Sequence, residues 1–502
     1  IIALLTLAMA CIIFMILSTA RASVRAIEVW VRKVVGAGRP LIAMQFVGEA
    51  VLMCLIAAGV ALLAVDFLLP WFNDFTEKEM GIPYRAVPFW AAWCGLVTLT
   101  GLLAGSYPAL VLSVFRPVTV LKNHIETQKG GLLRKTLVVG QFAIAAFLLA
   151  GMVIVNQQLG YLHNKNLGYQ KTQLLYVSMD YEQAQHYHAI KSELLRTPGV
   201  RSVSASGQRL TGYGNSSNAF AWENKSADDD RMITFQPVQK DYLKTIGTEL
   251  VEGRDFSDAF GADTANVVLN ESAVKAMGLK PPYIGQPFET WGNPGQIIGV
   301  VKDFNFQTLK YKIEPLILVN SSPHTYTLYV RLDGQNTPET LRNIEQVCKK
   351  YSPLFPFDYA FADEAYHRLY QSEQVLAELA SVFTFLAIFI SCLGLFGLSA
   401  FTAERRTREI GIRKVLGATT GSIVGLLSKD FLSLVLLALL LASPLAWFFM
   451  EKWLQDFAYR IDIRWTVFVL TAVLSILVAG FTVAFQSVRA ALANPVESLR
   501  SQ

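Results

Sequence analysis

The sequence predicts an α-helical integral membrane protein with about seven transmembrane helices in two pseudo-repeated modules, and with one α+β domain outside the cytoplasm. Of its 502 residues, 53% are hydrophobic and only 17% are charged, whereas about a quarter of the residues are charged in an ordinary soluble domain. The apolar residues are concentrated in 1–159 and 375–490, and 160–374 has the composition of a globular domain. A third observation, an internal repeat, predicts the two modules.

Seven apolar stretches are long enough to cross the hydrocarbon core, which takes about 20 helical residues. They lie near 1–20, 41–69, 89–114, 136–156, 375–400, 428–450 and 465–487. Segments 21–40, 115–135 and 401–420 are rich in Lys and Arg, whereas 70–88 is not. Because basic loops stay inside, we expect these three segments and the C-terminus in the cytoplasm, and 157–374 outside. Orientation in the bilayer therefore explains the net charge of +5, and no nucleic-acid partner is expected.

The outer region contains six short runs of aliphatic and aromatic residues separated by turn residues, a pattern typical of strands. These runs are 174–179, 231–238, 266–270, 296–301, 315–319 and 326–332. Two segments are predicted to be helices: 337–351, with Thr337 as N-cap, and 363–383, which we expect to continue unbroken into the fifth span. Only Cys348 of the five cysteines falls in this region, which excludes a disulfide framework and a cysteine metal cluster there.

One clear repeat relates two cytoplasmic segments that each follow a span. EVWVRKVVGAGRP at 28–40 matches EIGIRKVLGATTG at 409–421, 381 positions further on. The matching residues are Glu28/Glu409, Arg32/Arg413, Lys33/Lys414, Val34/Val415, Gly36/Gly417 and Ala37/Ala418, and Glu49 is paired with Asp430. FRPVTVLK at 115–122 also parallels ANPVESLR at 493–500. From this register we expect about 250 residues, with one more span and outer domain, before Ile1.

Each repeated segment is predicted to be a short amphipathic helix. Its glutamate and arginine are four residues apart and face each other, residues such as Ile410 and Ile412 provide an apolar side, and Gly417 ends the helix. Such a helix can lie on lipid headgroups or dock into a groove of a cytoplasmic partner. Two copies favour a two-fold partner. We interpret Glu49 and Asp430, at the membrane face, as partners of nearby basic residues rather than proton carriers.

The ordered motifs resemble the FtsX-like, MacB-type ABC transporter permease family, in particular two-module permeases of the Bacteroidetes lineage. The resemblance rests on 393–418, KWLQDFAYRIDI (452–463), NPVESLR (494–500), LRKTLVVGQF (133–142), GRDF (253–256), VVLNESAVKAMG (267–278) and GVVKDFNFQTL (299–309). It implies a MacB-like periplasmic core domain, a bacterial inner-membrane location and a cytoplasmic ABC ATPase, expected to be a dimer, that contacts 21–40 and 401–420. A periplasmic adaptor and an outer-membrane channel are further partners that the resemblance allows.

The resemblance also implies a domain division. We expect the last three spans of a first module at 1–125, the first span of a second at 131–159, the core domain at 160–374 and three more spans at 375–502. The predicted docking residues are Glu409, Ile410, Ile412, Arg413, Lys414, Gly417 and Ala418, with Glu28, Arg32, Lys33, Gly36 and Ala37 in the first copy. Val29-Trp30-Val31 departs from the family pattern, so the second copy is the better predicted docking site.

Other motifs carry little chemistry. The sequence contains no phosphate-binding loop and no metalloprotease or hydrolase motif, so we expect no enzyme and no cofactor in this chain, with ATP bound by the partner ATPase. His186 and His188 could bind metal with His163, although surface histidines are the more common case. Lys302 and Asp303 could mark a ligand site, although a solvated turn is the more common case.

The sequence therefore predicts a transport subunit that relays ATPase motion to the outer domain, by mechanotransmission, for efflux or extraction. One alternative is a membrane signalling subunit of the FtsX or Bce type that controls a periplasmic hydrolase or sensor kinase. A second is a membrane-anchored binding module without an ATPase. Drugs, peptides, lipoproteins and lipids remain open as substrates.

Overall fold

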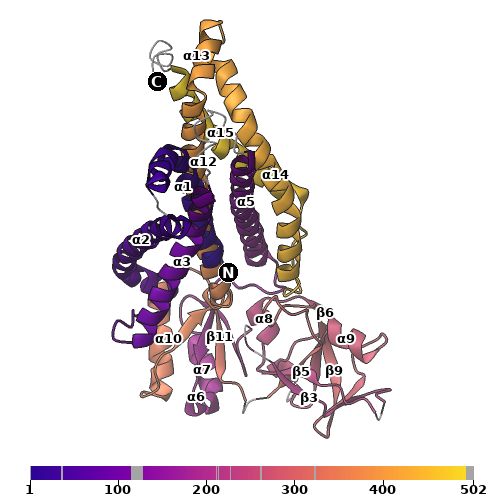
Figure 1. Ribbon diagram of the computed structural model, residues 1–502. Helices are drawn as coiled ribbons and strands as arrows, with labels where there is room; N and C mark the ends of the chain where they lie inside the picture. The colour runs from indigo at the N-terminus through magenta and orange to yellow at the C-terminus, as the bar shows by residue number, and fades with distance from the viewer. Residues whose placement is uncertain are drawn as a thin grey trace. The chain divides into compact units, whose positions relative to one another are not determined.

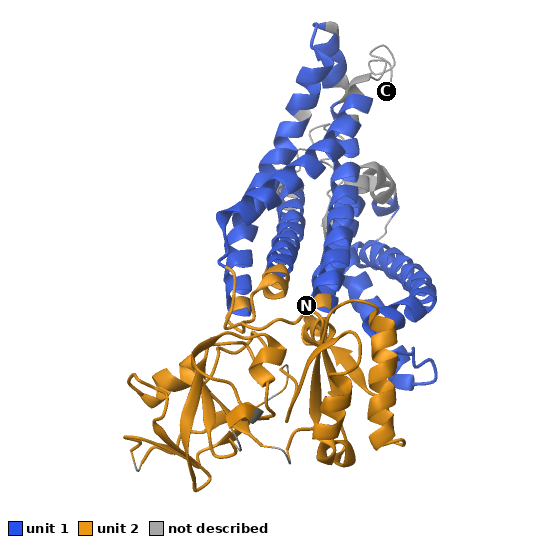
Figure 2. Ribbon diagram, turned by 180° about the vertical axis from the view of Figure 1, so that it is seen from behind, with its two compact units in different colours: residues 1–157, 375–453, 462–502 blue, residues 158–374, 454–461 orange. Residues whose placement is uncertain are grey.

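The computed structural model describes residues 2–35, 38–114, 128–210, 212, 214–226, 228–260, 263–321 and 324–492. The chain divides into two compact units (Figure 2): residues 1–157, 375–453 and 462–502 form the membrane unit, and residues 158–374 and 454–461 form the outer unit.

The membrane unit is built from long apolar helices. They are α1 (Ile2–Val34), α2 (Arg39–Thr76), α3 (Val87–Val114), α5 (Gln128–Asn164), α12 (Gln371–Arg405), α13 (Thr407–Val415), α14 (Thr420–Leu454) and α15 (Trp465–Leu492). Among the described residues, six helices are long and apolar enough to span a bilayer, and they contain the last six predicted spans. The apolar part of α1 found among those residues, Ile2–Ser18, is shorter, so the predicted span at 1–20 stays a prediction.

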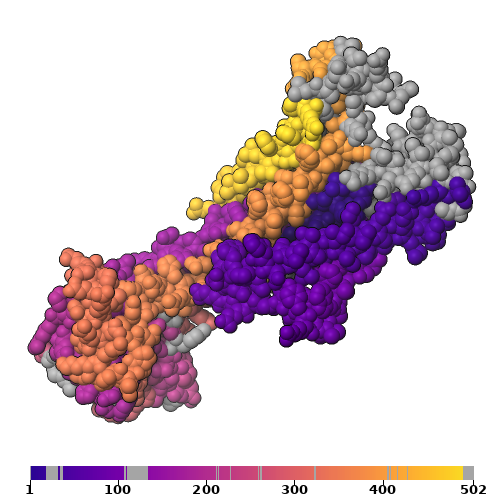
Figure 3. All heavy atoms as spheres, turned by 90° about the vertical axis from the view of Figure 1, so that its left-hand side faces the viewer, coloured from indigo at the N-terminus to yellow at the C-terminus, as the bar shows by residue number. Residues whose placement is uncertain are grey.

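Glycines within 101–109 and 394–400 allow close helix packing in this unit. A Cβ atom on Gly101 would lie 2.8 Å from the Val51 Cα atom, and one on Gly105 would lie 2.8 Å from the Ala50 Cβ atom. Helices α2 and α3 therefore lie side by side in close contact (Figure 3). On α12, a Cβ atom on Gly397 would lie 2.4 Å from the Leu17 Cδ2 atom of α1. The core joins α1, α5, α12, α14 and α15 through residues such as Val139 and Val435.

The outer unit contains a twelve-stranded mixed sheet with short helices (Figure 1). Its strands are β1 (Leu174–Ser178), β2 (Val200–Ser206), β3 (Asn215–Ser217), β4 (Phe220–Trp222), β5 (Ile233–Val238), β6 (Leu250–Gly253), β7 (Val267–Asn270), β8 (Pro287–Thr290), β9 (Asn293–Val301), β10 (Leu316–Asn320), β11 (Thr327–Leu332) and β12 (Tyr359–Phe361). The order is β12-β1-β11-β2-β5-β10-β7-β9-β8-β4, while β3 pairs with β5 and β6 with β9. All six predicted strands are present.

The sheet has two lobes because β2 and β5 are joined by one residue pair, Ser206 and Val238. One lobe packs β1, β2 and β11 against α7 (Tyr187–Leu194) and α10 (Thr337–Tyr351), and the other packs β7, β9 and β10 against α9 (Glu271–Met277). The remaining short elements are α6 (Tyr181–Gln185), α8 (Tyr242–Ile246), the 3-10 helix η1 (Asp258–Phe260) and α11 (Ala362–Arg368).

Two details of the helix predictions were wrong. The N-cap of α10 is Asn336, whose left-handed φ is 48°, and Thr337 is the first helical residue. The predicted continuous helix from 363 is interrupted at Leu369 and Tyr370, between α11 and α12. The Leu369 and Tyr370 N–H groups donate to carbonyls three residues back, which tightens the last turn of α11.

Candidate functional site

The second repeated segment forms α13, which a turn at Arg406 separates from α12. The Arg413 guanidinium lies 2.7 Å from the Glu409 carboxylate, and both side chains are nearly half exposed. This is the ion pair predicted from the spacing of four, which stabilises a helix by about 0.2–0.5 kcal/mol. The pair therefore strengthens the helix modestly and leaves its charged groups at the surface.

The end of α13 explains why glycine and alanine follow the basic residues. Gly417 has a φ of 91°, in the left-handed region. Its N–H donates to the Lys414 carbonyl at 3.1 Å, and the Ala418 N–H donates to the Arg413 carbonyl at 2.9 Å. These two bonds form a Schellman motif. Ala418 then packs against the buried Ile410 and Ile423, which fixes α13 on α14.

Apolar side chains remain exposed beside this cap. Leu416 is 80% exposed and Ile412 is 47% exposed, next to the exposed guanidinium of Arg413. Ile410 is buried, so the two isoleucines have different environments. The exposed face of α13 thus combines apolar and charged groups, a combination that can dock on a protein groove or on lipid headgroups.

The first repeated segment differs in shape. Helix α1 continues through Val34 without a break, whereas α13 is separate from α12. The side chain of Glu28, and Gly36 and Ala37 altogether, lie outside the described residues, as do the repeated motifs at 115–122 and 493–500. Val35, the counterpart of Leu416 by the repeat, is 83% exposed.

Each of the two repeated acids has a polar partner, and for Asp430 that partner is basic. The Asp430 carboxylate is 3.4 Å from the Arg406 guanidinium. Arg32 donates to the Gln45 Oε1 atom at 2.6 Å, and the Gln45 amide donates to the Glu49 carboxylate at 3.2 Å. In both copies the acid at the eleventh position of the following helix is thus connected, directly or through Gln45, to the basic segment before it. Lys33 and Lys414 are partly buried.

Lys302 and Asp303 of the outer unit are engaged in structural contacts. Asp303 accepts hydrogen bonds from the Ser272 N–H at 2.9 Å and the Ser272 hydroxyl at 2.7 Å, at the start of α9. The Lys302 ammonium lies 3.0 Å from the Glu249 carboxylate. Asp303 therefore stabilises the N-terminus of α9, and Lys302 forms an exposed ion pair just after β9.

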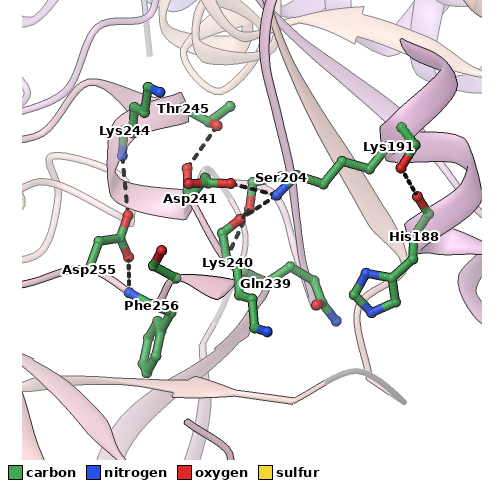
Figure 4. Close-up of polar contacts among 12 residues, drawn as sticks. His188, Lys191, Ser204, Gln239, Lys240, Asp241, Lys244, Thr245, Asp255 and Phe256 are labelled. Carbon is green, nitrogen blue, oxygen red and sulfur yellow. Dashed lines mark hydrogen bonds and ion pairs between the residues drawn. The ribbon is translucent and has the colours of Figure 1, made fainter. Parts of the chain in front are cut away.

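The GRDF motif is also structural, and its last two residues, Asp255 and Phe256, are shown in Figure 4. A Cβ atom on Gly253 would lie 2.2 Å from the Ile298 carbonyl oxygen, and Arg254 bonds Asp263 in a bidentate pair at 2.7 and 2.9 Å. Asp255 accepts from the N–H groups of Leu243, Lys244 and Phe256. Burial raises the pKa of Asp255 to about 6, against the lowering effect of these donors.

Figure 4 also shows the charged contact that connects α7 with the residue preceding α8. The Lys191 ammonium donates to the Asp241 carboxylate at 2.6 Å and to the Lys240 carbonyl at 3.2 Å. Asp241 has a left-handed φ of 66°. The contact holds an irregular connection in place.

The histidines do not form the triad that metal binding would need. His186 and His188 are exposed, as predicted, and His163 instead contacts His367, with 2.5 Å between its Nε2 atom and the His367 Nδ1 atom. Within the described part of the chain, no group of three or more His, Cys, Asp or Glu side chains could hold a metal ion. All five cysteines are free.

Two buried polar residues were not predicted from the sequence. Arg331, on β11, donates to the carbonyls of Thr245, Thr172, Gln170 and Ile246. Gln158, on α5, is fully buried and bonds the backbone at Tyr459 and Ile461. Each side chain bonds backbone far away in the sequence, so spacing gives no signal for it.

Comparison with known proteins identifies two regions. A family model described as "FtsX-like permease C-terminal" matches residues 1–117 and 381–495. A model described as "MacB-like periplasmic core domain" matches residues 136–347. Together these three ranges overlap all six candidate spans found among the described residues and cover most of the outer unit.

Two curated relatives are each 23% identical to this chain over 39% of its length. One, from Pseudomonas syringae, is named "Probable syringafactin export ATP-binding/permease protein SyfD", and the match covers 31% of its length. The other, from Bacillus subtilis, is named "Uncharacterized ABC transporter permease YknZ", and the match covers 52% of its length. The matched part is thus a third to a half of each relative.

Solved structures are similar to part of this chain. The periplasmic region of MacB from Actinobacillus actinomycetemcomitans is 17% identical, with a TM-score of 0.30 over 41% of this chain and 97% of that structure. The extracellular domain of YknZ from Gram-positive bacteria is 14% identical, with a TM-score of 0.27 over 37% and 97%.

Proposed function

We propose that this chain, which belongs to the ABC transporter permease family as an FtsX-like permease with a MacB-like periplasmic core domain, relays ATP-driven motion from a cytoplasmic ATPase to its outer unit. Permeases of this family are non-catalytic membrane subunits, and the chain is a multi-pass membrane protein. The ATP that drives the transporter is bound by the separate ATPase. The relayed motion displaces a substrate in the periplasm, so that the substrate is exported or extracted.

This proposal rests on the surface of α13, which is fixed in position and exposes apolar and charged side chains. The Schellman cap and the contact of Ile410 with Ile423 hold the helix in one position. Leu416 and Ile412 stay exposed beside Arg413. A fixed helix with apolar anchors and a flanking charge suits a groove in a protein partner. We place the ATPase contact at Glu409, Ile412, Arg413, Lys414 and Leu416.

We further propose that the chain holds parts of two permease modules. The FtsX-like model matches two separate ranges, and Val35 in the first copy is as exposed as Leu416 in the second. The segment around Arg32 and Lys33 is then the second docking point for a two-fold ATPase. In this arrangement we expect the chain in the inner membrane, with its C-terminus in the cytoplasm and the outer unit in the periplasm.

Between cargo transport and signalling, we favour transport. One relative carries the word export in its name. Purification of a hydrolase or a sensor kinase through the outer unit would instead support the signalling function.

The test is co-purification of the ATPase with the full chain in detergent. Arg413→Glu with Lys414→Glu reverses both charges in the last turn of α13 and is expected to release the ATPase. The matched control, Lys349→Glu with Lys350→Glu, reverses an adjacent basic pair in the last turn of α10 and should retain it. Equal retention by both double variants would refute docking at α13.

A further inference from the structure

The loop between the last two spans is bonded to a buried amide. Residues 455–464 connect α14 to α15. The fully buried Gln158 side chain donates from Nε2 to the Tyr459 carbonyl at 2.9 Å and accepts at Oε1 from the Ile461 N–H at 3.0 Å. A buried amide is costly unless both ends are bonded. Both hydrogen bonds of the Gln158 side-chain amide are therefore present only while the loop keeps this position.

A second set of bonds attaches the same loop to Leu309 and Lys310 within the outer unit. The Ala458 N–H donates to the Lys310 carbonyl at 3.1 Å, and the Tyr459 N–H donates to the Leu309 carbonyl at 3.4 Å. Phe457 is buried, and the Lys310 ammonium lies 5.8 Å from the centre of its ring. The loop is thus held by backbone bonds and by apolar burial.

The same two residues, Leu309 and Lys310, also bond the start of α12. The Leu309 N–H donates to the Tyr370 hydroxyl at 2.7 Å, just before α12 begins. The Lys310 ammonium lies 2.6 Å from the Glu373 carboxylate in the first turn of α12. Nearby, the Tyr366 hydroxyl of α11 donates to the Leu162 carbonyl of α5 at 2.9 Å. Three connections to the spans therefore meet within one network of the outer unit.

We propose that Gln158, Leu309 and Lys310 form a junction that fastens the α14–α15 loop within the outer unit, so that α14 and α15, as well as α5 and α12, transmit motion to this unit. Gln158 is the positioning residue of this junction. The inference rests on the proposed relay function, because an unfastened loop of this length would absorb movement of α14 and α15 by bending. The junction also gives a role to the KWLQDFAYRIDI and GVVKDFNFQTL motifs, whose residues meet in it.

The first experiment tests, without any nucleotide, whether these hydrogen bonds hold the α14–α15 loop in place. Gln158→Leu keeps the approximate volume and removes both bonds, and its matched control is Gln157→Leu at the adjacent exposed glutamine. Backbone amide exchange of 455–461 in the full chain, in nanodiscs, should be at least tenfold faster in Gln158→Leu and unchanged in Gln157→Leu. Unchanged exchange in both variants would overturn the junction. Ala458→Pro, which removes the donor to Lys310 without altering a buried side chain, should also accelerate exchange in the loop and serves if Gln158→Leu fails to fold.

The second experiment separates the junction from the relay. With the ATPase bound, amide exchange of the outer unit should differ between the ADP state and the trapped ATP state in the wild type. In Gln158→Leu this difference should be at least halved. A full difference in Gln158→Leu would overturn the junction and leave the relay standing. Absence of any difference in the wild type would overturn the relay itself, whereas the exchange of the loop would still report whether it is fastened.

Discussion

Replacing Gly417 with alanine should weaken binding of the ATPase without removing any side-chain contact. The residue has a φ of 91°, and no atom lies within 4 Å of where its Cβ atom would be. The cost is therefore that of left-handed backbone in a residue with a Cβ atom, about 1–2 kcal/mol. If docking requires the capped end of α13, the Kd should rise about 5- to 30-fold.

The chain offers a matched control at Gly278, which ends α9 in the outer unit. Its φ is 66°, its Cβ site is also empty, and the Leu279 N–H donates to the Val274 carbonyl as in the other Schellman motif. Gly278→Ala should lower the thermal stability of the outer unit and leave the Kd unchanged. Gly417→Asn should restore part of the affinity, since asparagine tolerates this conformation best among residues other than glycine.

The assay is a titration of the detergent-solubilised chain with labelled ATPase, followed by fluorescence anisotropy. If Gly417→Ala binds as tightly as the wild type while Gly278→Ala is destabilised as expected, the capped end of α13 is not part of the docking surface. Equal weakening by both alanine variants would attribute the effect to general loss of stability.

Three further predictions concern the rest of the chain. Arg331→Met leaves four carbonyl acceptors without their charged donor. Chemical denaturation should show that the free energy of unfolding of the outer unit falls by about 3 kcal/mol. A decrease below about 1 kcal/mol would contradict this reasoning. Burial, together with the charges of His163 and Lys171, lowers the pKa of His367, so the folded state binds fewer protons than the unfolded state and the outer unit should lose thermal stability as the pH falls below about 6.5. His367→Gln should reduce that loss, and an identical pH profile would refute the assignment. Gly105→Leu should separate α2 from α3, because a Cβ atom already meets Ala50, and should lower the melting temperature in detergent more than Gly95→Leu, whose site is open.

Local features of this protein could be predicted from the sequence, and contacts between distant segments could not. The Glu409–Arg413 pair and the end of α13 at Gly417 depend on residues within one or two turns, so spacing was sufficient. Strand β2 was missed because its alternate serines resemble a polar loop. In the structure, the Ser204 and Ser206 hydroxyls are buried and donate to backbone carbonyls.

The candidate docking segment was found because it occurs twice, whereas the junction at Gln158 had no such signal. Its bonds connect α5 to a loop about three hundred residues later, and a glutamine near the end of a span is equally compatible with solvent exposure. The break between α11 and α12 was missed for a related reason. Tyr366 and Tyr370 fit the apolar face of a continuous helix, but their hydroxyl groups bond segments that only the fold brings near.

The central claim is that ATPase motion reaches the outer unit through this chain, and amide exchange of 158–374 in nanodiscs with the bound ATPase tests it most directly. Trapping the ATP state should change protection in the outer unit relative to ADP, and Arg413→Glu with Lys414→Glu should abolish the change. Identical exchange in the two nucleotide states, with the ATPase bound and hydrolysing, would contradict the account.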